Sequence, residues 1–362
     1  MKKIIGSVEY EIIENIAEGG MGSVVKALKK GVEGFEKVVA IKTLLDCYSS
    51  DKKFVTKFIE EAKLVANLVH ENIVQIYQLD KFNGDYYFVL EYVDGVSLYD
   101  FIEFHKKIRQ CFPENLAVFI AARIARGLAY AHSRCDATGS PLNIVHCDVC
   151  PHNIMITTEG LPKLTDFGIA RAVNMGDDDS VSGKLPFMSP EQANRQNIDF
   201  RSDIYSLGAV LFYMLSSGYT ARRLEGQLKD ILQQAKDNCI DWTRLPKDTN
   251  KDLLVILRLM LDTDPGERYQ KTSELARDLE YHIYKDGYGP TIVTLANYMR
   301  ETMPSLYEPR PGTGKDRDAL SKSSVDIDNQ PEKTIVLPDE YFQGGKNETT
   351  TEMCSRKTVV LP

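Results

Sequence analysis

The amino-acid sequence predicts an α+β protein of two lobes, in which a small antiparallel β lobe with one helix precedes a larger, mainly α-helical lobe. Two observations lead to this prediction. Short runs rich in β-branched and aromatic residues fill 10–93, interrupted by a single helical stretch. From 94 to 287 the apolar residues recur at helical spacing instead. We therefore expect one lobe at 10–93 and the other at 94–287.

The first lobe contains five predicted strands and one helix. The strands are expected at 10–16, 23–29, 37–43, 73–80 and 86–92, and the helix at 54–68. Strands this short, separated by turns, form a small sheet in which neighbours run mainly antiparallel.

Helices dominate the second lobe. They are expected at 114–133, 202–217, 251–261 and 273–284, and the nearly continuous apolar character of 202–217 predicts a buried helix. A further helix at 291–301 belongs to an extension at 288–303. The remaining residues, 304–362, mix Pro, Gly, Ser, Thr and charge without an apolar period, so we expect a disordered or conditionally ordered tail.

The composition is that of an ordinary globular protein and argues against several classes. Of 362 residues 43% are hydrophobic, and the formal charge of -8 provides no net positive field to hold nucleic acid. No apolar run is long enough to cross a bilayer, and the first residues pass into polar Gly6 and Ser7 rather than an apolar signal core. Seven irregularly spaced cysteines fit a reducing compartment. We expect a cytoplasmic protein without nucleic-acid or membrane partners.

A glycine-rich stretch lies between the first two predicted strands. From Ile16 to Val24 the chain reads I-A-E-G-G-M-G-S-V, with glycines at Gly19, Gly20 and Gly22. A tight hairpin of this composition lets backbone N–H groups approach phosphate oxygens without obstruction by side chains. By itself, such a hairpin is as often only a turn.

Further motifs follow the glycine-rich hairpin. V-A-I-K at 39–42 puts Lys42 on the third strand, and Glu61 lies on the next helix, nine residues before His70. L-E-Y-V-D-G follows at 90–95, H-C-D-V-C-P-H-N at 146–153 and T-D-F-G at 165–168. M-S-P-E at 188–191 and S-D-I-Y-S-L-G at 202–208 complete the series. The order and spacing of so many motifs make a purely structural origin improbable.

Together these motifs resemble the protein kinase family, and in detail the bacterial serine/threonine kinases of the eukaryotic (Hanks) type. The resemblance covers about residues 10–284 and implies the two-lobed kinase fold. It also implies that Asp203 braces the backbone of the catalytic loop and that Arg268 pairs with Glu191. Such buried charges need partners, which is why these pairs mark a fold.

The resemblance implies a site for ATP. Lys42 would pair with Glu61, for which Glu60 is the competing candidate, and its ammonium would then bind the α and β phosphates. Backbone groups of Glu91 and Val93 would hydrogen-bond the adenine. Judged singly, the apolar residues of this site are as typical of a core. The residues implied to bind the nucleotide are Ile16, Gly19, Gly20, Gly22, Val24, Ala40, Lys42, Glu61, Leu90 (as gatekeeper), Glu91, Val93 and Met155.

The resemblance also implies catalytic and metal-binding roles. Asp148 corresponds to the carboxylate that orients the substrate hydroxyl and accepts its proton. Asn153 and Asp166 correspond to the magnesium ligands, and carboxylate and carboxamide oxygens are the hard ligands that this ion prefers.

The chain departs from the family's pattern near the phosphates. Ala17 replaces the first glycine of the hairpin, and Cys147 replaces an arginine that receives an activation-loop phosphate, so that contact cannot operate. Cys150 replaces a lysine that contacts the γ-phosphate, and losing one such donor typically costs on the order of a hundred- to a thousandfold in turnover. Lys184 replaces a threonine that normally bonds Asp148 and the missing lysine. We hypothesise that Lys184 substitutes for that lysine; the alternative is that it points to solvent.

The two cysteines of the loop form a C-x-x-C motif. His146 and His152 flank Cys147 and Cys150, which invites a redox or zinc interpretation. In the kinase fold, however, the two thiols point in different directions, toward the activation segment and toward the phosphates. We therefore favour an interpretation without redox or metal chemistry.

The tail contains a repeat, K-T-I-V-L-P at 333–338 and K-T-V-V-L-P at 357–362. Thr334 and Thr358 each precede an aliphatic residue by three positions. A phosphothreonine with that neighbour resembles the ligand of forkhead-associated domains, which hold the phosphate with charge-assisted hydrogen bonds. A pair of short, sticky strands is the alternative interpretation.

The sequence as a whole predicts an ATP- and magnesium-dependent kinase that phosphorylates Ser/Thr hydroxyls of proteins, including its own, with Asp148, Lys42 and Lys184 as catalytic residues. The alternative is a pseudokinase that binds nucleotide and acts as a scaffold or allosteric partner. The retained acidic residues and the strand lysine favour the enzyme, whereas the four departures favour the pseudokinase.

Overall fold

The computed structural model describes residues 3–5, 9–19, 22–44, 59, 62–82, 85–167, 185–226 and 228–308. The chain divides into two compact units, Met1–Tyr307 and Glu308–Pro362, and the fold below is that of the first. Gly20, Glu61, Lys184 and the tail threonines Thr334 and Thr358 lie outside the described residues.

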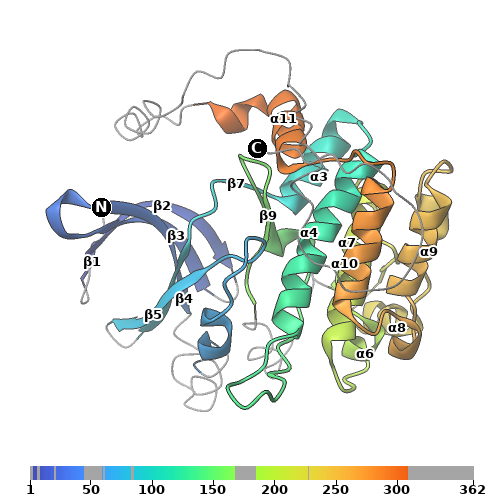
Figure 1. The fold of residues 1–362 in the computed structure, drawn as a ribbon, viewed down its shortest axis with the longest axis horizontal. Coiled ribbons are helices and arrows are strands. Elements are labelled where there is room, and N and C mark those ends of the chain that lie inside the picture. The colour runs from blue at the N-terminus through green and yellow to red at the C-terminus, as the bar shows by residue number, and fades with distance from the viewer. Residues whose placement is uncertain are drawn as a thin grey trace, which may run out of the picture. The chain divides into compact units, whose positions relative to one another are not determined.

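An antiparallel sheet of six described strands forms the first lobe (Figure 1), in the order β1-β2-β3-β4-β6-β5. The strands are β1 (Lys3–Ile5), β2 (Glu9–Gly19), β3 (Gly22–Lys30), β4 (Glu36–Leu44), β5 (Ile76–Phe82) and β6 (Asp85–Glu91). One face buries Tyr10, Val39, Ile41 and Val89 in a common apolar cluster. The predicted small antiparallel lobe is therefore confirmed.

The strand expected at 73–80 begins later than predicted, at Ile76. Ile73 forms an isolated bridge with Leu164, and the backbone N–H of Val74 donates to the carbonyl of Leu164 over 2.9 Å. Ile73 and Val74 thus pair with Leu164 of β9 before the chain enters the six-stranded sheet at Ile76.

A second antiparallel sheet, of three described strands, consists of β7 (Gly95–Ser97), β8 (Ile154–Thr157) and β9 (Pro162–Leu164). It lies where the chain passes from the first sheet to the helices (Figure 1). Since β8 directly follows the motif at 146–153 and β9 directly precedes the one at 165–168, this hairpin sets the spacing of the two acidic motifs.

Helices form the rest of the second lobe, around α4 and α7, which pack against each other (Figure 1). The α-helices are α3 (Leu98–Ile108), α4 (Glu114–His132), α6 (Pro190–Ala193), α7 (Phe200–Leu215), α8 (Leu228–Asp237), α9 (Lys251–Met260), α10 (Thr272–Tyr284) and α11 (Ile292–Thr302). The 3-10 helices are η1 (Val32–Gly34), η2 (Pro151–Asn153), η3 (Leu185–Phe187), η4 (Trp242–Arg244), η5 (Pro265–Glu267) and η6 (Pro304–Tyr307). Every residue of α7 from Ser202 to Leu215 is buried, so the predicted buried helix is confirmed.

The helix predicted at 291–301 is present as α11, which begins after the capping residue Thr291. Its Leu295 and Met299 belong to the same apolar core as α4 and α7. The β8–β9 turn meets α11 closely: a Cβ added to Gly160 would lie 2.0 Å from the carbonyl oxygen of Ile292. The extension thus packs as an integral part of the helical lobe.

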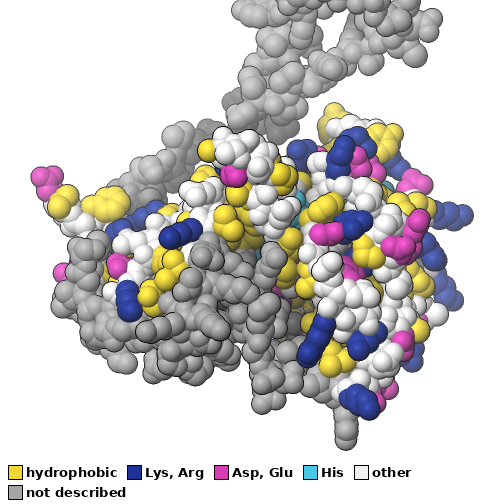
Figure 2. Space-filling view, turned by 90° about the horizontal axis from the view of Figure 1, so that it is seen from below, with side chains coloured by type: hydrophobic (Ala, Val, Ile, Leu, Met, Phe, Trp, Pro, Cys, Tyr) yellow, Lys and Arg dark blue, Asp and Glu magenta, His cyan; other side chains and the backbone are white. Residues whose placement is uncertain are grey.

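Charged side chains of both signs are scattered over the described surface of the helical lobe (Figure 2). No described helix combines the length and the apolar character that a membrane crossing requires.

Candidate active site

Asp203, on the buried helix α7, holds the backbone of the loop at 146–153. Its Oδ2 accepts from the backbone N–H of His146 over 2.7 Å, and its Oδ1 accepts from that of Cys147 over 2.8 Å. His132 Nε2 lies 2.9 Å from the same carboxylate, which is 0% exposed. A buried carboxylate needs such donors, and here they fix the start of the loop. The predicted brace is confirmed.

Cys147 keeps the backbone geometry of the loop although the family's arginine is missing. Its φ of 65° lies in the left-handed region, which costs a non-glycine residue about 1 kcal/mol. Besides the bond to Asp203, its carbonyl accepts from Gln192 Nε2, on α6, over 2.9 Å. The thiol donates a weak, 3.8 Å bond to the carbonyl of Val145. The backbone contacts with Asp203 and Gln192 hold the turn.

His146 connects this loop with the strand that precedes Asp166. Its Nδ1 accepts from the backbone N–H of Asp148 over 3.1 Å. Since an amide can only donate, the ring proton is on Nε2, which donates to the carbonyl of Thr165 over 2.9 Å. The imidazole is 0% exposed and ties the two acidic motifs together at a set separation.

Asn153 orients the carboxylate of Asp148. Its Nδ2 donates to Asp148 Oδ2 over 2.8 Å and to the carbonyl oxygen of the same residue over 2.9 Å. Because both bonds use the amide nitrogen, the Oδ1 of Asn153 faces the opposite way. One side chain thus positions the carboxylate of Asp148 and leaves its own amide oxygen on the other side.

Lys42, on β4, forms an ion pair with Asp166 across the two lobes. Its Nζ lies 2.6 Å from Asp166 Oδ1. Asp166 has φ 64°, again in the left-handed region, which is strained for a non-glycine residue. The expected partner Glu61 lies outside the described residues.

The predicted adenine residues come together beside this pair. Val24, Ala40, Leu90 and Val93 share one apolar cluster, and Ala40 stands opposite Leu90 in the β4–β6 ladder. The backbone N–H of Glu91 is taken by the carbonyl of Gln75, and its carboxylate pairs with Lys163. The Glu91–Lys163 pair was not predicted.

The other predicted nucleotide residues that the structure describes lie on β2, β3 and β8. Met155 lies on β8 opposite Ser97, and Ile16 lies on β2 with 48% of its surface exposed. Gly19 pairs with Gly22 at the end of the β2–β3 ladder, so the predicted hairpin pairing is present on both sides of residues 20–21, which lie outside the described residues.

This donor set fits a magnesium-bound nucleoside triphosphate. Asp166 and Asn153 supply the carboxylate and carboxamide oxygens that magnesium prefers, and the ammonium of Lys42 beside them matches a polyphosphate. The apolar cluster around Ala40 and Leu90 matches a flat base. No set of three metal-ligating His, Cys, Asp or Glu side chains occurs in the described part of the chain.

Cys150 puts an apolar group at the phosphate end of the loop. Its thiol is 1% exposed and belongs to the main apolar core. Neither Cys147 nor Cys150 forms a disulfide bond. The position that carries a lysine in the family therefore contributes no charge here.

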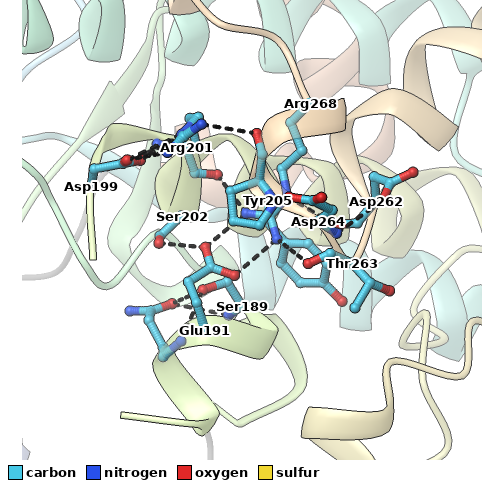
Figure 3. Close-up of polar contacts among 12 residues, drawn as sticks. Ser189, Glu191, Asp199, Arg201, Ser202, Tyr205, Asp262, Thr263, Asp264 and Arg268 are labelled. Atoms are coloured by element: carbon cyan, nitrogen blue, oxygen red, sulfur yellow. Dashed lines mark hydrogen bonds and ion pairs between the residues drawn. The ribbon is translucent and has the colours of Figure 1, made fainter. Parts of the chain in front are cut away.

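A buried ion pair secures the segment that follows the site (Figure 3). Arg268 donates to both carboxylate oxygens of Glu191, over 2.7 and 2.9 Å, and the hydroxyl of Ser202 donates to the same carboxylate over 2.6 Å. Burial by itself would raise the pKa of Glu191, but the bonds and charge of Arg268 bring this pKa below its usual value. The predicted pair is confirmed.

Three contacts of the region were missed by sequence reasoning. Gln192 holds the carbonyl of Cys147, His132 Nδ1 lies 2.8 Å from Thr272 Oγ1, and Arg222 binds several backbone carbonyls. Each is a single polar residue without a spacing pattern, so no sequence signal distinguished it from a solvated side chain.

The two-lobed fold, with its strand lysine, braced catalytic loop and acidic pair, defines the class as the protein kinase fold. The family model described as the protein kinase domain matches residues 10–282. The chain belongs to this family.

Curated relatives are bacterial kinases. The chain is 32% identical over 295 residues to the tyrosine-protein kinase MasK of Myxococcus xanthus, covering 80% of this chain and 45% of that protein. It is 33% identical over 282 residues to the serine/threonine-protein kinase PrkC of Bacillus subtilis, covering 77% and 41%. The chain thus spans less than half the length of these two relatives. The resemblance to bacterial kinases of the eukaryotic type is confirmed.

A solved structure agrees on the fold. The kinase domain of PknI from Mycobacterium tuberculosis superposes with a TM-score of 0.57 at 22% identity, covering 75% of this chain and 94% of that one. The predicted fold class is confirmed.

Proposed function

We propose that this chain is a protein kinase that uses magnesium and ATP to phosphorylate Ser/Thr hydroxyls of proteins, including its own. Two contacts support the proposal most strongly, because they bring the four polar side chains together in pairs. Asn153 donates to Asp148 over 2.8 Å, and Lys42 donates to Asp166 over 2.6 Å. The name of PrkC supports the choice of Ser/Thr, while MasK is named for tyrosine.

The residues divide the work as follows. Asp148, oriented by Asn153, accepts the proton of the incoming hydroxyl. Lys42 holds the phosphates, and Asp166 with Asn153 holds the metal, which neutralises charge on the transferred group when bound. Lys184 supplies the ammonium that position 150 lacks. Positioning and charge, more than covalent chemistry, carry phosphoryl transfer, so these few groups suffice.

The pseudokinase is the second candidate, and the buried, uncharged Cys150 favours it. In that case the chain binds nucleotide and acts as a scaffold or allosteric partner. Radiolabelled phosphate transfer to the chain itself and to myelin basic protein separates the two. For the kinase we expect label from wild type and a loss of about a hundredfold or more in Asp148→Asn, with nucleotide binding retained. No label from either protein, despite binding, rejects the kinase.

We further propose that Thr334 and Thr358, once phosphorylated, bind a forkhead-associated domain. Each threonine is followed at the third position by Leu337 or Leu361, the offset that such domains recognise. Mass spectrometry after incubation with ATP and magnesium tests the first step. Phosphate on both threonines is expected, and its absence from both counts against the docking role.

A further inference from the structure

The helical lobe contains a cavity of about 490 Å³, and none of the described residues that line it is one predicted to bind nucleotide. Its walls come from the second half of α4, the first residue of α7 and the first turn of α10, three helices that pack against one another (Figure 1). His70, in the segment that precedes β5, also lines it. The volume is typical of sites for small organic molecules.

The walls of the cavity carry positive charge. Arg126 of α4 and Lys271, the residue before α10, line it, and no Asp or Glu does so among the described residues. Glu280 accepts from Nε and Nη2 of Arg126. Glu274 lies 3.7 Å from the ammonium of Lys271. Neither carboxylate lines the cavity, and both ion pairs are partly exposed to solvent, where such pairs are weak. A negatively charged ligand matches these walls.

Uncharged donors line the same space. The Nδ1 of His70 accepts from the backbone N–H of Asn72 over 3.1 Å, so Nε2 carries the ring proton. Burial lowers the pKa of His70, which keeps the ring neutral at neutral pH. No acceptor among the described residues binds this Nε2–H. Thr272 and Ser273 open α10 and also line the cavity, and their N-cap residue forms no side-chain bond to the helix. Donors in this state match a ligand that brings its own oxygens.

Aromatic rings form the remaining part of the walls. The rings of His70 and Tyr130 lie side by side, with centroids 5.2 Å apart, and those of His132 and Phe200 are 5.6 Å apart. All four residues line the cavity. Planar side chains of this kind suit a flat apolar group, because ring contacts stabilise beyond the area that they bury. The lining as a whole thus fits an organic anion that carries an aromatic ring.

One residue of the wall contacts the anchor of the catalytic loop. Since a carboxylate accepts, Nε2 of His132 donates to Asp203 Oδ2, over 2.9 Å, while Nδ1 of His132 lies 2.8 Å from Thr272 Oγ1. Asp203 in turn accepts from the backbone N–H groups of His146 and Cys147. Two hydrogen bonds therefore join the wall of the cavity to the loop that carries the candidate base.

We propose that this cavity is a binding site for a small organic anion with an aromatic ring, such as an aryl phosphate, and that its occupancy stabilises the anchor of the catalytic loop. The anionic group lies toward Lys271 and the start of α10, and the ring packs against the aromatic side chains. An opening of the anchor that disrupts the cavity has to release the ligand, so occupancy makes such openings rarer. The site goes beyond the proposed function, because binding there requires no phosphate transfer.

A titration of the full chain with phenyl phosphate, followed by ligand-observed NMR, tests the ligand class. We expect saturable binding with a Kd of about 1 mM or below. Inorganic phosphate lacks the ring and benzyl alcohol lacks the charge, so each is expected to bind about tenfold more weakly or worse. No saturation by about 10 mM phenyl phosphate, or an equal affinity for either fragment, overturns the proposal.

Charge reversal tests the location. Lys271→Glu puts a carboxylate on the wall and is expected to raise the Kd for phenyl phosphate about fivefold or more. Arg277→Glu is the matched control, because the two side chains are 72% and 73% exposed and only Lys271 lines the cavity. Its Kd should stay within about twofold of wild type, and equal effects of the two variants contradict the location. Binding that is lost in Lys42→Ala but kept in Lys271→Glu assigns the ligand to the nucleotide site and rejects the proposal.

Hydrogen exchange tests the connection to the catalytic loop and needs no kinase activity. With phenyl phosphate at about ten times its wild-type Kd, the amides of His146 and Cys147 should exchange about tenfold more slowly in wild type. At the same concentration, the slowing in Lys271→Glu should be at most about threefold, because its site is only partly filled. Unchanged exchange in wild type rejects the stabilisation of the anchor, and equal slowing in Lys271→Glu rejects the site as its source.

Discussion

The two ends of the catalytic loop differ in how they are built. At its start, the N–H groups of His146 and Cys147 bind the carboxylate of Asp203, and that arrangement holds although Cys147 replaces the family's arginine. Toward its end, Cys150 lies in the apolar core, at the position where the resemblance implies a lysine that contacts the γ-phosphate. A contact made by the backbone is retained when the side chain changes. A contact made by a charged side chain is lost with that side chain, and another charged group has to replace it.

The largest effect is expected where the start of the loop is anchored. Asp203→Ala removes the acceptor of two backbone N–H groups and of His132, so we expect a loss of about 3–5 kcal/mol in the free energy of unfolding. Asp199→Ala is the control, since it removes the N-cap of the same helix and a partly exposed ion pair with Arg201, and should cost about 1–2 kcal/mol. Urea denaturation of both variants measures the difference, and equal losses would contradict the anchoring role.

The ion pair behind the loop is expected to give a smaller, pH-dependent effect. The folded-state pKa of Glu191 is below its ordinary 4.5, so its contribution to stability is present above pH 4.5 and is lost as the pH falls below that value. Glu191→Gln should cost about 3 kcal/mol at pH 7 and should flatten this part of the acid dependence. Unfolding free energies at a series of pH values check both. An unchanged slope in the variant would exclude Glu191 as its source.

The contrast between the loop's two ends also marks what the sequence could predict. Asp203 and the Glu191–Arg268 pair were predicted and found, because residue type and spacing identify them. The predicted pairing of Lys42 with Glu61 stays a prediction, because Glu61 lies outside the described residues. The contact of Lys42 with Asp166 was not predicted, because motif spacing does not show which carboxylates approach a lysine. The buried contacts of Arg222 could not be predicted from the sequence, since a single arginine between two helices belongs to no repeating pattern or motif.

The ends of helices and strands were also harder to predict from the sequence than the elements themselves. The strand expected from 73 begins at Ile76 because Ile73 and Val74 pair with Leu164, ninety or so residues away in the chain. Local pattern predicts that an element exists, but tertiary pairing decides where it starts. The same applies to α11, whose helix was predicted but whose close packing on Gly160 was not.

The smallest effect is expected for the side chain of Cys147. Because backbone hydrogen bonds to Asp203 and Gln192 hold the turn, and a hydroxyl can replace the weak 3.8 Å bond of the thiol, Cys147→Ser should change the free energy of unfolding by no more than about 0.5 kcal/mol. Phosphate transfer should also be equal in oxidant and in reductant. A transfer rate that depends on redox state in wild type and not in Cys147→Ser would restore the redox interpretation of the C-x-x-C motif.

The proposal that Lys184 replaces the missing lysine is tested most directly by phosphate transfer from labelled ATP in Lys184→Ala. The account predicts a loss on the order of a hundred- to a thousandfold, with nucleotide binding retained, and partial recovery when Cys150→Lys is added to Lys184→Ala. A wild-type rate in Lys184→Ala would contradict it.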